Sequence, residues 1–236
     1  MNLTQQIKNS RQSPIIGIIG ATLPNRSYLA QEGVQVGYQV RRFVEAIGKG
    51  SIFTGGVSGV GVDAYRGVLK FCKEKKSGFG DDTFFVMVPT NFEYFSKELR
   101  QVVSLPYRPP RIYEELAASS KSGKLDIIRA GENMLERRKY VASVADVQIL
   151  VNGGLGTLEE ALMSMKNGIP VIAVKSTGGV ARKLPSLRDN PGMLESLYEF
   201  EEEGPEIDLK GINFDLLKVV ANPLEVFDML GRVIQN

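Results

Sequence analysis

Short apolar runs alternate with segments of helical spacing along this 236-residue chain. An apolar run of four to eight residues, bounded by glycine, proline or polar residues, is typical of a buried strand. Such runs occur at 15–19 (IIGII), 51–56 (SIFTGG), 83–89 (TFFVMVP), 147–151 (VQILV), 170–174 (PVIAV) and 216–220 (LLKVV). We therefore predict a buried strand at each of them.

The segments between these runs show the apolar spacing of helices. In 32–50, valines and a phenylalanine recur at roughly helical spacing before two glycines stop the helix. A helix after Asn222 has that residue as its predicted N-cap, Pro223 in the first helical position and Glu225 as the acid of a capping box. Further helices are predicted at 62–73, 113–118, 131–144 and 157–166.

Strands that alternate with helices are typical of a parallel sheet with helices on both faces. We predict an α/β fold, a Rossmann-like doubly wound open parallel sheet in three layers. The chain length favours a single domain at 14–236, preceded by a flexible N-terminal lead-in at 1–13. Residues 105–124 contain several prolines and small residues, and we expect a long surface excursion there. The acidic segment 198–208 is expected to be a solvated surface loop.

Composition narrows the possible chemistry. The chain has 29 basic and 27 acidic residues and a net charge of +2, so no sign dominates the surface and nucleic acid is not the expected partner. Cys72 is the only cysteine, and there is no histidine. Disulfides, ordinary structural zinc sites and imidazole bases are thereby excluded. No segment is long and apolar enough for a signal peptide or a membrane span, which indicates a cytoplasmic protein.

Two predicted strands end in glycine clusters. Gly55, Gly56 and Gly59 follow the run at 51–56, and Gly153, Gly154 and Gly156 follow the run at 147–151. The carboxyl ends of the strands of such a sheet are where ligands bind, and glycine backbone beside a helix N-terminus suits a phosphate. A single cluster is more often only a tight turn, but two together favour a ligand. Neither matches the Walker or the dinucleotide pattern, so a mononucleotide is the expected ligand.

Charged residues flank the second glycine cluster. Glu159 and Glu160 are predicted in the first turn of the helix, where one of them stabilises the helix end and the other faces the ligand. A carboxylate repels phosphate, so that acid is expected to contact the sugar. Arg137 and Arg138 would supply compensating positive charge from the preceding helix. The alternative is that 137–139 form a solvated face.

These motifs resemble the LOG-type Rossmann-fold family of cytokinin-activating phosphoribohydrolases, once labelled possible lysine decarboxylases. The matching segments are GGLGTLEE at 153–160, ERRKYVASVAD at 136–146 and TGGVSGVGVDA at 54–64, within a resemblance that covers 15–174. It implies hydrolysis of the N-glycosidic bond of a nucleoside 5′-monophosphate to free base and ribose 5-phosphate, without a cofactor. It also implies a homodimer or higher homo-oligomer, which apolar faces around Phe43 and Leu162 would permit.

The resemblance also assigns roles to individual residues. It makes Arg137 and Glu160 the catalytic pair, in which Glu160 stabilises the positive charge on the sugar. The residues that it implies in phosphate or nucleotide binding are Gly153, Gly154, Gly156, Thr157, Gly55, Gly56, Gly59 and Arg138.

Three departures from the family pattern keep alternatives open. Asn152 stands where the family has proline, the loop GGVSGVGVDA lacks the usual Leu-Met, and the excursion at 105–124 is longer than in a minimal member. The principal alternative is a non-catalytic protein of the same fold that binds a nucleotide or carries molybdenum cofactor. A pyridoxal-phosphate decarboxylase is disfavoured, because no lysine has a recognisable Schiff-base context. Thr177, Gly178 and Gly179 form either part of the pocket rim or an ordinary loop.

Overall fold

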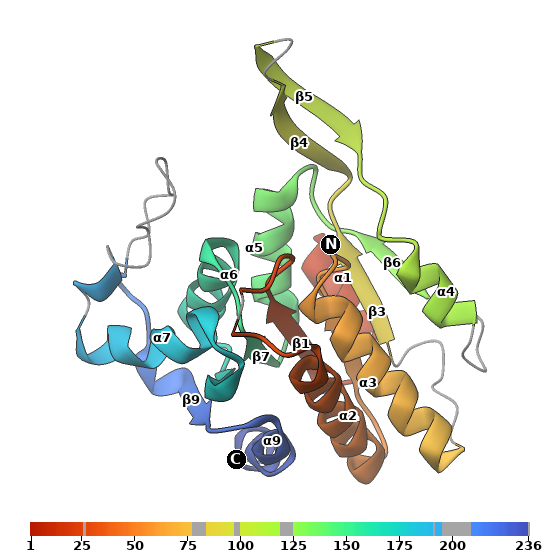
Figure 1. The fold of residues 1–236 in the computed structure, drawn as a ribbon, viewed down its shortest axis with the longest axis vertical. Helices are drawn as coiled ribbons and strands as arrows, with labels where there is room; N and C mark the ends of the chain where they lie inside the picture. The colour runs from red at the N-terminus through yellow and green to blue at the C-terminus, as the bar shows by residue number, and fades with distance from the viewer. Residues whose placement is uncertain are drawn as a thin grey trace.

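Parallel strands form a seven-stranded sheet in the order β6-β3-β2-β1-β7-β8-β9 (Figure 1). The computed structural model describes residues 1–25, 27–76, 84–96, 100–118, 125–190, 192–194 and 209–235. The predicted doubly wound parallel sheet is confirmed. The strands are β1 Ile15–Gly20, β2 Ser51–Thr54, β3 Phe84–Val88, β6 Asp126–Arg129, β7 Val147–Val151, β8 Val171–Val174 and β9 Leu217–Val220.

Helices cover both faces of the sheet, and each face has its own apolar core. Within β1, Ile16 and Ile18 belong to one core and Ile15 and Ile19 to the other. Because both faces are buried, the strand is apolar throughout instead of alternating. One face is covered by α2 Ala30–Ile47, α3 Val60–Lys75, α4 Ile112–Ala118 and α9 Val226–Ile234, and the other by α1 Leu3–Ser10, α5 Met134–Val144, α6 Leu155–Lys166 and α7 Gly179–Asp189.

The strand order reverses between β1 and β7. From β1 the chain builds outward through β2, β3 and β6, and from β7 it builds in the other direction through β8 and β9. Ile16 pairs with Val147 at the start of this contact and Gly20 with Val151 at its end. A crevice for ligands forms at such a reversal, beyond the carboxyl ends of the two central strands.

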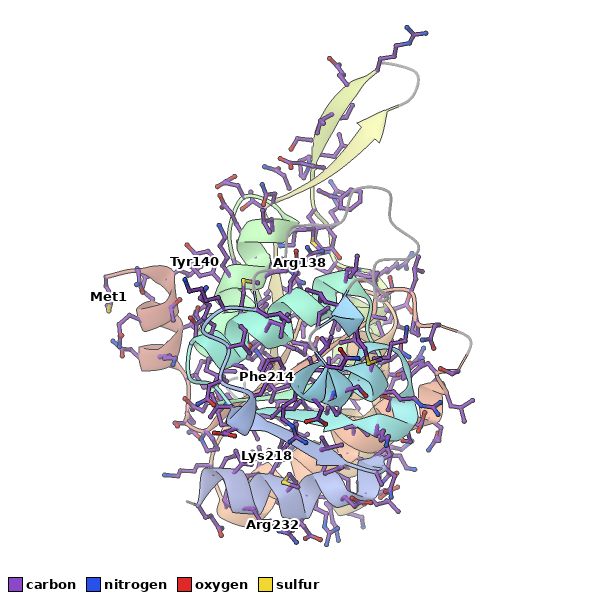
Figure 2. All side chains as sticks on the ribbon, turned by 90° about the vertical axis from the view of Figure 1, so that its left-hand side faces the viewer. Met1, Arg138, Tyr140, Phe214, Lys218 and Arg232 are labelled. Atoms are coloured by element: carbon purple, nitrogen blue, oxygen red, sulfur yellow. The ribbon has the colours of Figure 1, made fainter. Side chains whose placement is uncertain are left out.

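An antiparallel hairpin that the sequence analysis did not predict follows β3. It consists of β4 Asn91–Ser96 and β5 Gln101–Pro106 and extends away from the body of the molecule (Figures 1 and 2). The edge strand β6 was also not predicted. Within the expected excursion, residues 105–106 complete the hairpin and α4 is the predicted short helix, whereas 119–124 lie outside the described residues.

The N-terminal expectation was wrong. Residues 3–10 form helix α1, in which the Asn2 side chain accepts a hydrogen bond from the Gln5 amide and Ile7 is buried. Thr4 Oγ1 and Ser143 Oγ lie 3.0 Å apart, which links α1 to α5. The sequence 1–13 is polar overall, but Ile7 and the partly buried Leu3 pack on the core and dock this short helix.

The C-terminal expectation is confirmed with one modification. The Asn222 side chain accepts from the Leu224 amide, and Glu225 accepts from the Ala221 amide at 3.1 Å. The first turn, η3 Pro223–Glu225, is a 3-10 helix, and α9 begins after it. The acidic segment 198–208 lies outside the described residues.

The apolar faces expected to permit dimerisation are used within the chain. Phe43 and Leu162 are 2% and 3% exposed, and the ring of Phe43 packs edge-on against that of Phe227 in α9. Neither side chain is available to a partner. Among the described helices, none combines the length and the apolar composition that crossing a bilayer requires.

Candidate functional site

A hollow of about 220 Å³ lies at the carboxyl edge of the sheet, where the strand order reverses. Its walls come from the end of β1 and the segment 21–23 after it, the loop after β2, the start of α5 and the first turns of α6. The two glycine loops therefore meet around one cavity, although β1 separates their strands in the sheet. Arg137, Arg138, Thr157 and Glu160 all line it.

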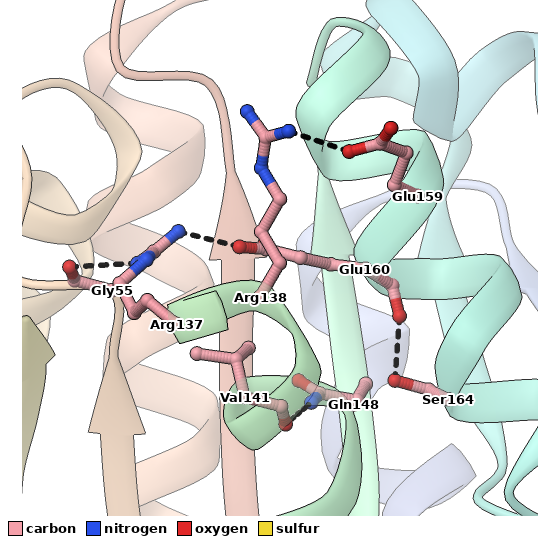
Figure 3. A network of polar contacts seen from close by, with 8 residues as sticks. All are labelled: Gly55, Arg137, Arg138, Val141, Gln148, Glu159, Glu160 and Ser164. Atoms are coloured by element: carbon pink, nitrogen blue, oxygen red, sulfur yellow. Dashed lines mark hydrogen bonds and ion pairs between the residues drawn. The ribbon is translucent and has the colours of Figure 1, made fainter. Parts of the chain in front are cut away.

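Arg137 joins the two loops. Its Nη2 donates to Oε1 of Glu160 at 2.5 Å, and its Nη1 donates to the carbonyl oxygen of Gly55 at 2.9 Å (Figure 3). The side chains of Arg137 and Glu160 are 5% and 6% exposed. The two residues predicted to be catalytic therefore lie together at the hollow. Because the pair is buried and Arg137 also contacts the backbone, its geometry is fixed.

Arg138 forms a second, parallel pair. Its Nη1 donates to Oε2 of Glu159 at 2.5 Å, with side-chain exposures of 26% and 10% (Figure 3). The solvated-face alternative therefore holds only for Lys139, which is exposed. The expected helix register was also wrong: α6 begins at Leu155, so both glutamates lie in its second turn and neither stabilises the helix end.

The electrostatics of Glu160 are set mainly by burial. Burial raises the pKa of Glu160 above its ordinary value, the guanidinium groups of Arg137 and Arg138 act to lower it, and the charge of Glu159 acts to raise it. The net direction is upward. Nε of Arg137 is buried without a hydrogen-bond acceptor among the described residues. Glu160 therefore loses its proton less readily than an exposed glutamate, and the guanidinium group of Arg137 keeps one N–H without an acceptor among the described residues.

The turn that leads into α6 exposes peptide N–H groups. The amides of Thr157 and Leu158 both donate to the carbonyl oxygen of Gly154. Within the described part of the chain, no acceptor is found for the amides of 154–156. A Cβ at Gly154 would have no atom within 4 Å, so this side of the turn is open. Unpaired amides at the positive end of a helix dipole suit an anion.

The remaining glycines serve other purposes than clearing space for a ligand. A Cβ at Gly156 would lie 2.8 Å from Cζ of Arg138, so this glycine makes room for a guanidinium group. Gly56 and Gly59 have φ of +63° and +71°. A Cβ at Gly59 would meet the carbonyl oxygens of the segment after β1, and neither residue lines the hollow. Gly153, with φ of +105°, packs on Thr157.

Asn152 links three loops, which the sequence analysis anticipated only as a departure from the family pattern. Its Nδ2 donates to Oδ1 of Asn25 at 3.1 Å and to the carbonyl oxygen of Thr177 at 2.7 Å, and its amide donates to Oγ1 of Thr177. Its φ is +54°, which proline cannot adopt. Thr177 is fully buried and supports the loop after β7, whereas Gly178 and Gly179 line a neighbouring hollow.

Two tyrosines hold the other glycine loop, and the sequence analysis did not identify them. Tyr107 donates from its hydroxyl to the carbonyl oxygen of Gly56 at 3.1 Å, and Tyr113 to that of Val57 at 2.9 Å. Burial raises the pKa of both hydroxyls, so both stay protonated donors at neutral pH. The excursion after β5 therefore fixes the loop that carries the Gly55 acceptor of Arg137. No motif in the sequence marks such a long-range contact.

Comparisons with known proteins identify the fold alone. No family model and no curated protein matches the sequence. The solved structure of a structural-genomics target named TM1055 matches 92% of this chain and 98% of its own, with a TM-score of 0.55 at 16% identity. The molybdenum cofactor carrier protein of Chlamydomonas reinhardtii matches 94% and 99%, with a TM-score of 0.52 at 15% identity. DNA processing protein A of Helicobacter pylori is described as binding single-stranded DNA. It matches 96% of this chain and 83% of its own, with a TM-score of 0.54 at 14% identity.

Proposed function

We propose that this protein is a LOG-like phosphoribohydrolase, which cleaves the N-glycosidic bond of a nucleoside 5′-monophosphate to free base and ribose 5-phosphate. The observation that carries the proposal is the buried pair of Arg137 and Glu160 beside the open amides of 154–156. An acid and a turn with unpaired peptide N–H groups line one hollow, which supports a phosphosugar as the ligand.

Each group has a defined part in this reaction. The 5′-phosphate accepts hydrogen bonds from the amides of 154–156 and from the Thr157 hydroxyl, at the positive end of the α6 dipole. The carboxylate of Glu160 faces the ribose. As the bond from C1′ to the base nitrogen breaks, positive charge spreads over C1′ and the ring oxygen, and the carboxylate stabilises it.

Water completes the hydrolysis. Its oxygen forms the new bond to C1′, and the departing base nitrogen carries the bonding electron pair and takes up a proton from solvent, to which the attacking water loses one. Arg137 holds the Glu160 carboxylate in one orientation through its contacts to Glu160 and Gly55. Preorganised charge of this kind acts where charge develops in the transition state, so no histidine is required.

The second candidate is a non-catalytic carrier of molybdenum cofactor or a related phosphorylated ligand. It is favoured by the match to the Chlamydomonas carrier protein over nearly the whole of both chains. For a carrier, the open amides of 154–156 suffice, and the Arg137 and Glu160 pair only supports the loop. Binding of single-stranded DNA has weaker support, because the chain has no excess of basic residues comparable to that of a nucleic-acid binder.

The two candidates differ in turnover. The protein is incubated with AMP, GMP, CMP and cytokinin monophosphates, and free base is measured by chromatography. The hydrolase releases base from at least one of them, and the release is abolished in Glu160→Gln but retained in Glu159→Gln, the matched change one residue away. Absence of release from every nucleotide, together with a nucleotide-dependent rise in Tm, would favour the carrier.

A further inference from the structure

A second hollow, of about 440 Å³, adjoins the first. The two share Leu23, Gly154 and Leu155 as lining residues, so they lie on two sides of one loop. Leu23 is 88% exposed, which places an apolar side chain at the mouth of both. The residues found only in the second hollow come from the loop after β1, the loop after β7 and the start of α7.

The two hollows differ in charge. At the first, Arg137 and Arg138 are each paired with a glutamate at 2.5 Å, so their charges are balanced. At the second, Arg182 and Lys183 are exposed, and neither forms a side-chain hydrogen bond or ion pair with any described residue. None of the described residues that line the second hollow is acidic. The unbalanced positive charge therefore faces the second hollow.

The positive charge at the second hollow comes from side chains and not from the N-terminal end of α7. Two of the first amides of α7 are already satisfied, because Val180 donates to the carbonyl oxygen of Gly153 at 3.0 Å and Ala181 to that of Asn152 at 2.9 Å. What the second hollow offers an anion is the pair of basic side chains at 182 and 183, which no described residue neutralises. Such groups recognise phosphate through charge and hydrogen bonds.

We propose that the ligand is a nucleoside diphosphate or a diphosphate-linked conjugate, with its second phosphate held in the second hollow by Arg182 and Lys183. This rests on the proposed function in one respect, that the first phosphate binds the amides of 154–156. Gly154 lines both hollows and has no side chain, so a diphosphate can extend past it with one phosphate in each hollow. A monophosphate would fill only the first hollow.

The test uses nucleotides that the proposed hydrolysis cannot consume. Formycin and pseudouridine 5′-phosphates have a carbon–carbon glycosidic bond, so their mono- and diphosphates can be compared by calorimetry. Wild-type protein should bind one of the diphosphates about tenfold more tightly than its monophosphate, a difference of about 1.4 kcal/mol. The double variant Arg182→Ala and Lys183→Ala should lose that advantage and keep its affinity for the monophosphate.

The matched control removes the same charge at the other edge of the sheet. Lys49 and Lys166 are exposed and precede β2 and β8, so Lys49→Ala with Lys166→Ala should keep the tenfold preference. Equal affinity for mono- and diphosphate in the wild type, or a preference that survives in the Arg182 and Lys183 variant, would overturn the inference. Base release from AMP would still stand in either case. Absence of both binding and base release would instead overturn the proposed function together with the inference.

Discussion

Gly55 and Arg137 lie in direct contact: Nη1 of the arginine donates to the glycine carbonyl at 2.9 Å, and a Cβ on Gly55 would overlap the same nitrogen. The Gly55 backbone does not have positive φ, so alanine fits the local conformation. Gly55→Ala should therefore leave the fold intact but shift the guanidinium group relative to Glu160.

We expect Gly55→Ala to lower the rate of base release at least tenfold while it changes the free energy of unfolding by only about 1–2 kcal/mol. The measurements are initial rates and urea denaturation. Gly231→Ala is the matched control, because no atom lies within 4 Å of its added Cβ and it lies in α9, outside both hollows. An unchanged rate in Gly55→Ala would show that the position of Arg137 does not matter for turnover.

Arg137 and Glu160 should be strongly coupled in stability. Each is about 5% exposed, so removing one partner leaves a buried charge without a counter-charge. Arg137→Met should cost about 3–5 kcal/mol of the free energy of unfolding, a range typical of a broken buried pair, whereas Glu160→Gln, the neutral analogue of the protonated carboxyl, should cost less. Adding Arg137→Met to Glu160→Gln should cost less than the sum of the single changes, measured as a double-mutant cycle in urea.

The control cycle uses the exposed pair of Arg111 and Glu115, whose side chains are 87% and 58% exposed. Solvent screens such a pair, so its changes should be small and additive. Additive effects at Arg137 and Glu160 as well would mean that the two charges do not stabilise one another.

The acidic limb of the pH–rate profile should lie above the ordinary glutamate range. Burial raises the pKa of Glu160 from its ordinary value of 4.5, and turnover needs the ionised carboxylate. The rate should therefore fall as the pH drops through this raised pKa. The contribution of Glu160 to folding stability changes with pH in the opposite direction. The protonated carboxyl favours the folded state, and this contribution is complete below the ordinary pKa and is lost as the pH rises through the raised one.

Glu159 provides a check on this assignment. Its negative charge acts to raise the pKa of Glu160, so Glu159→Gln should move the acidic limb to lower pH. The measurement is the initial rate of base release in buffers of constant ionic strength. A limb that stays in place in Glu159→Gln would mean that a group other than Glu160 controls the rate.

The fold follows from the sequence where local pattern and burial agree. The apolar runs 15–19 and 147–151 are covered on both faces, so continuous hydrophobicity alone marks them as central strands. The edge strand β6 has only partial burial, and its four residues carry no such run. The hairpin β4–β5 packs on its own partner strand, so its sequence 91–106 shows no core-facing pattern.

The candidate site likewise has one part that the sequence predicts and one part that it does not. Glycines and charges adjacent to β7 are contiguous in the sequence, so their proximity follows from the strand–loop–helix order. Tyr107 reaches Gly56 and Asn152 reaches Asn25 across separations that no local pattern encodes. Even the start of α6 differed by two residues, because the N-cap is Gly154 and not a residue with a polar side chain.

Asn152 provides the most direct test of how this loop departs from the family pattern. Its φ of +54° excludes proline, so Asn152→Pro should force the turn to rearrange and cost about 3 kcal/mol or more of the free energy of unfolding. Asn152→Gly accepts the same φ and loses only the side-chain contacts to Asn25 and Thr177, so about 1–2 kcal/mol is expected. Urea denaturation measures both. If Asn152→Pro is as stable as Asn152→Gly, the positive φ is not a requirement of the loop, and the family proline would fit here after all.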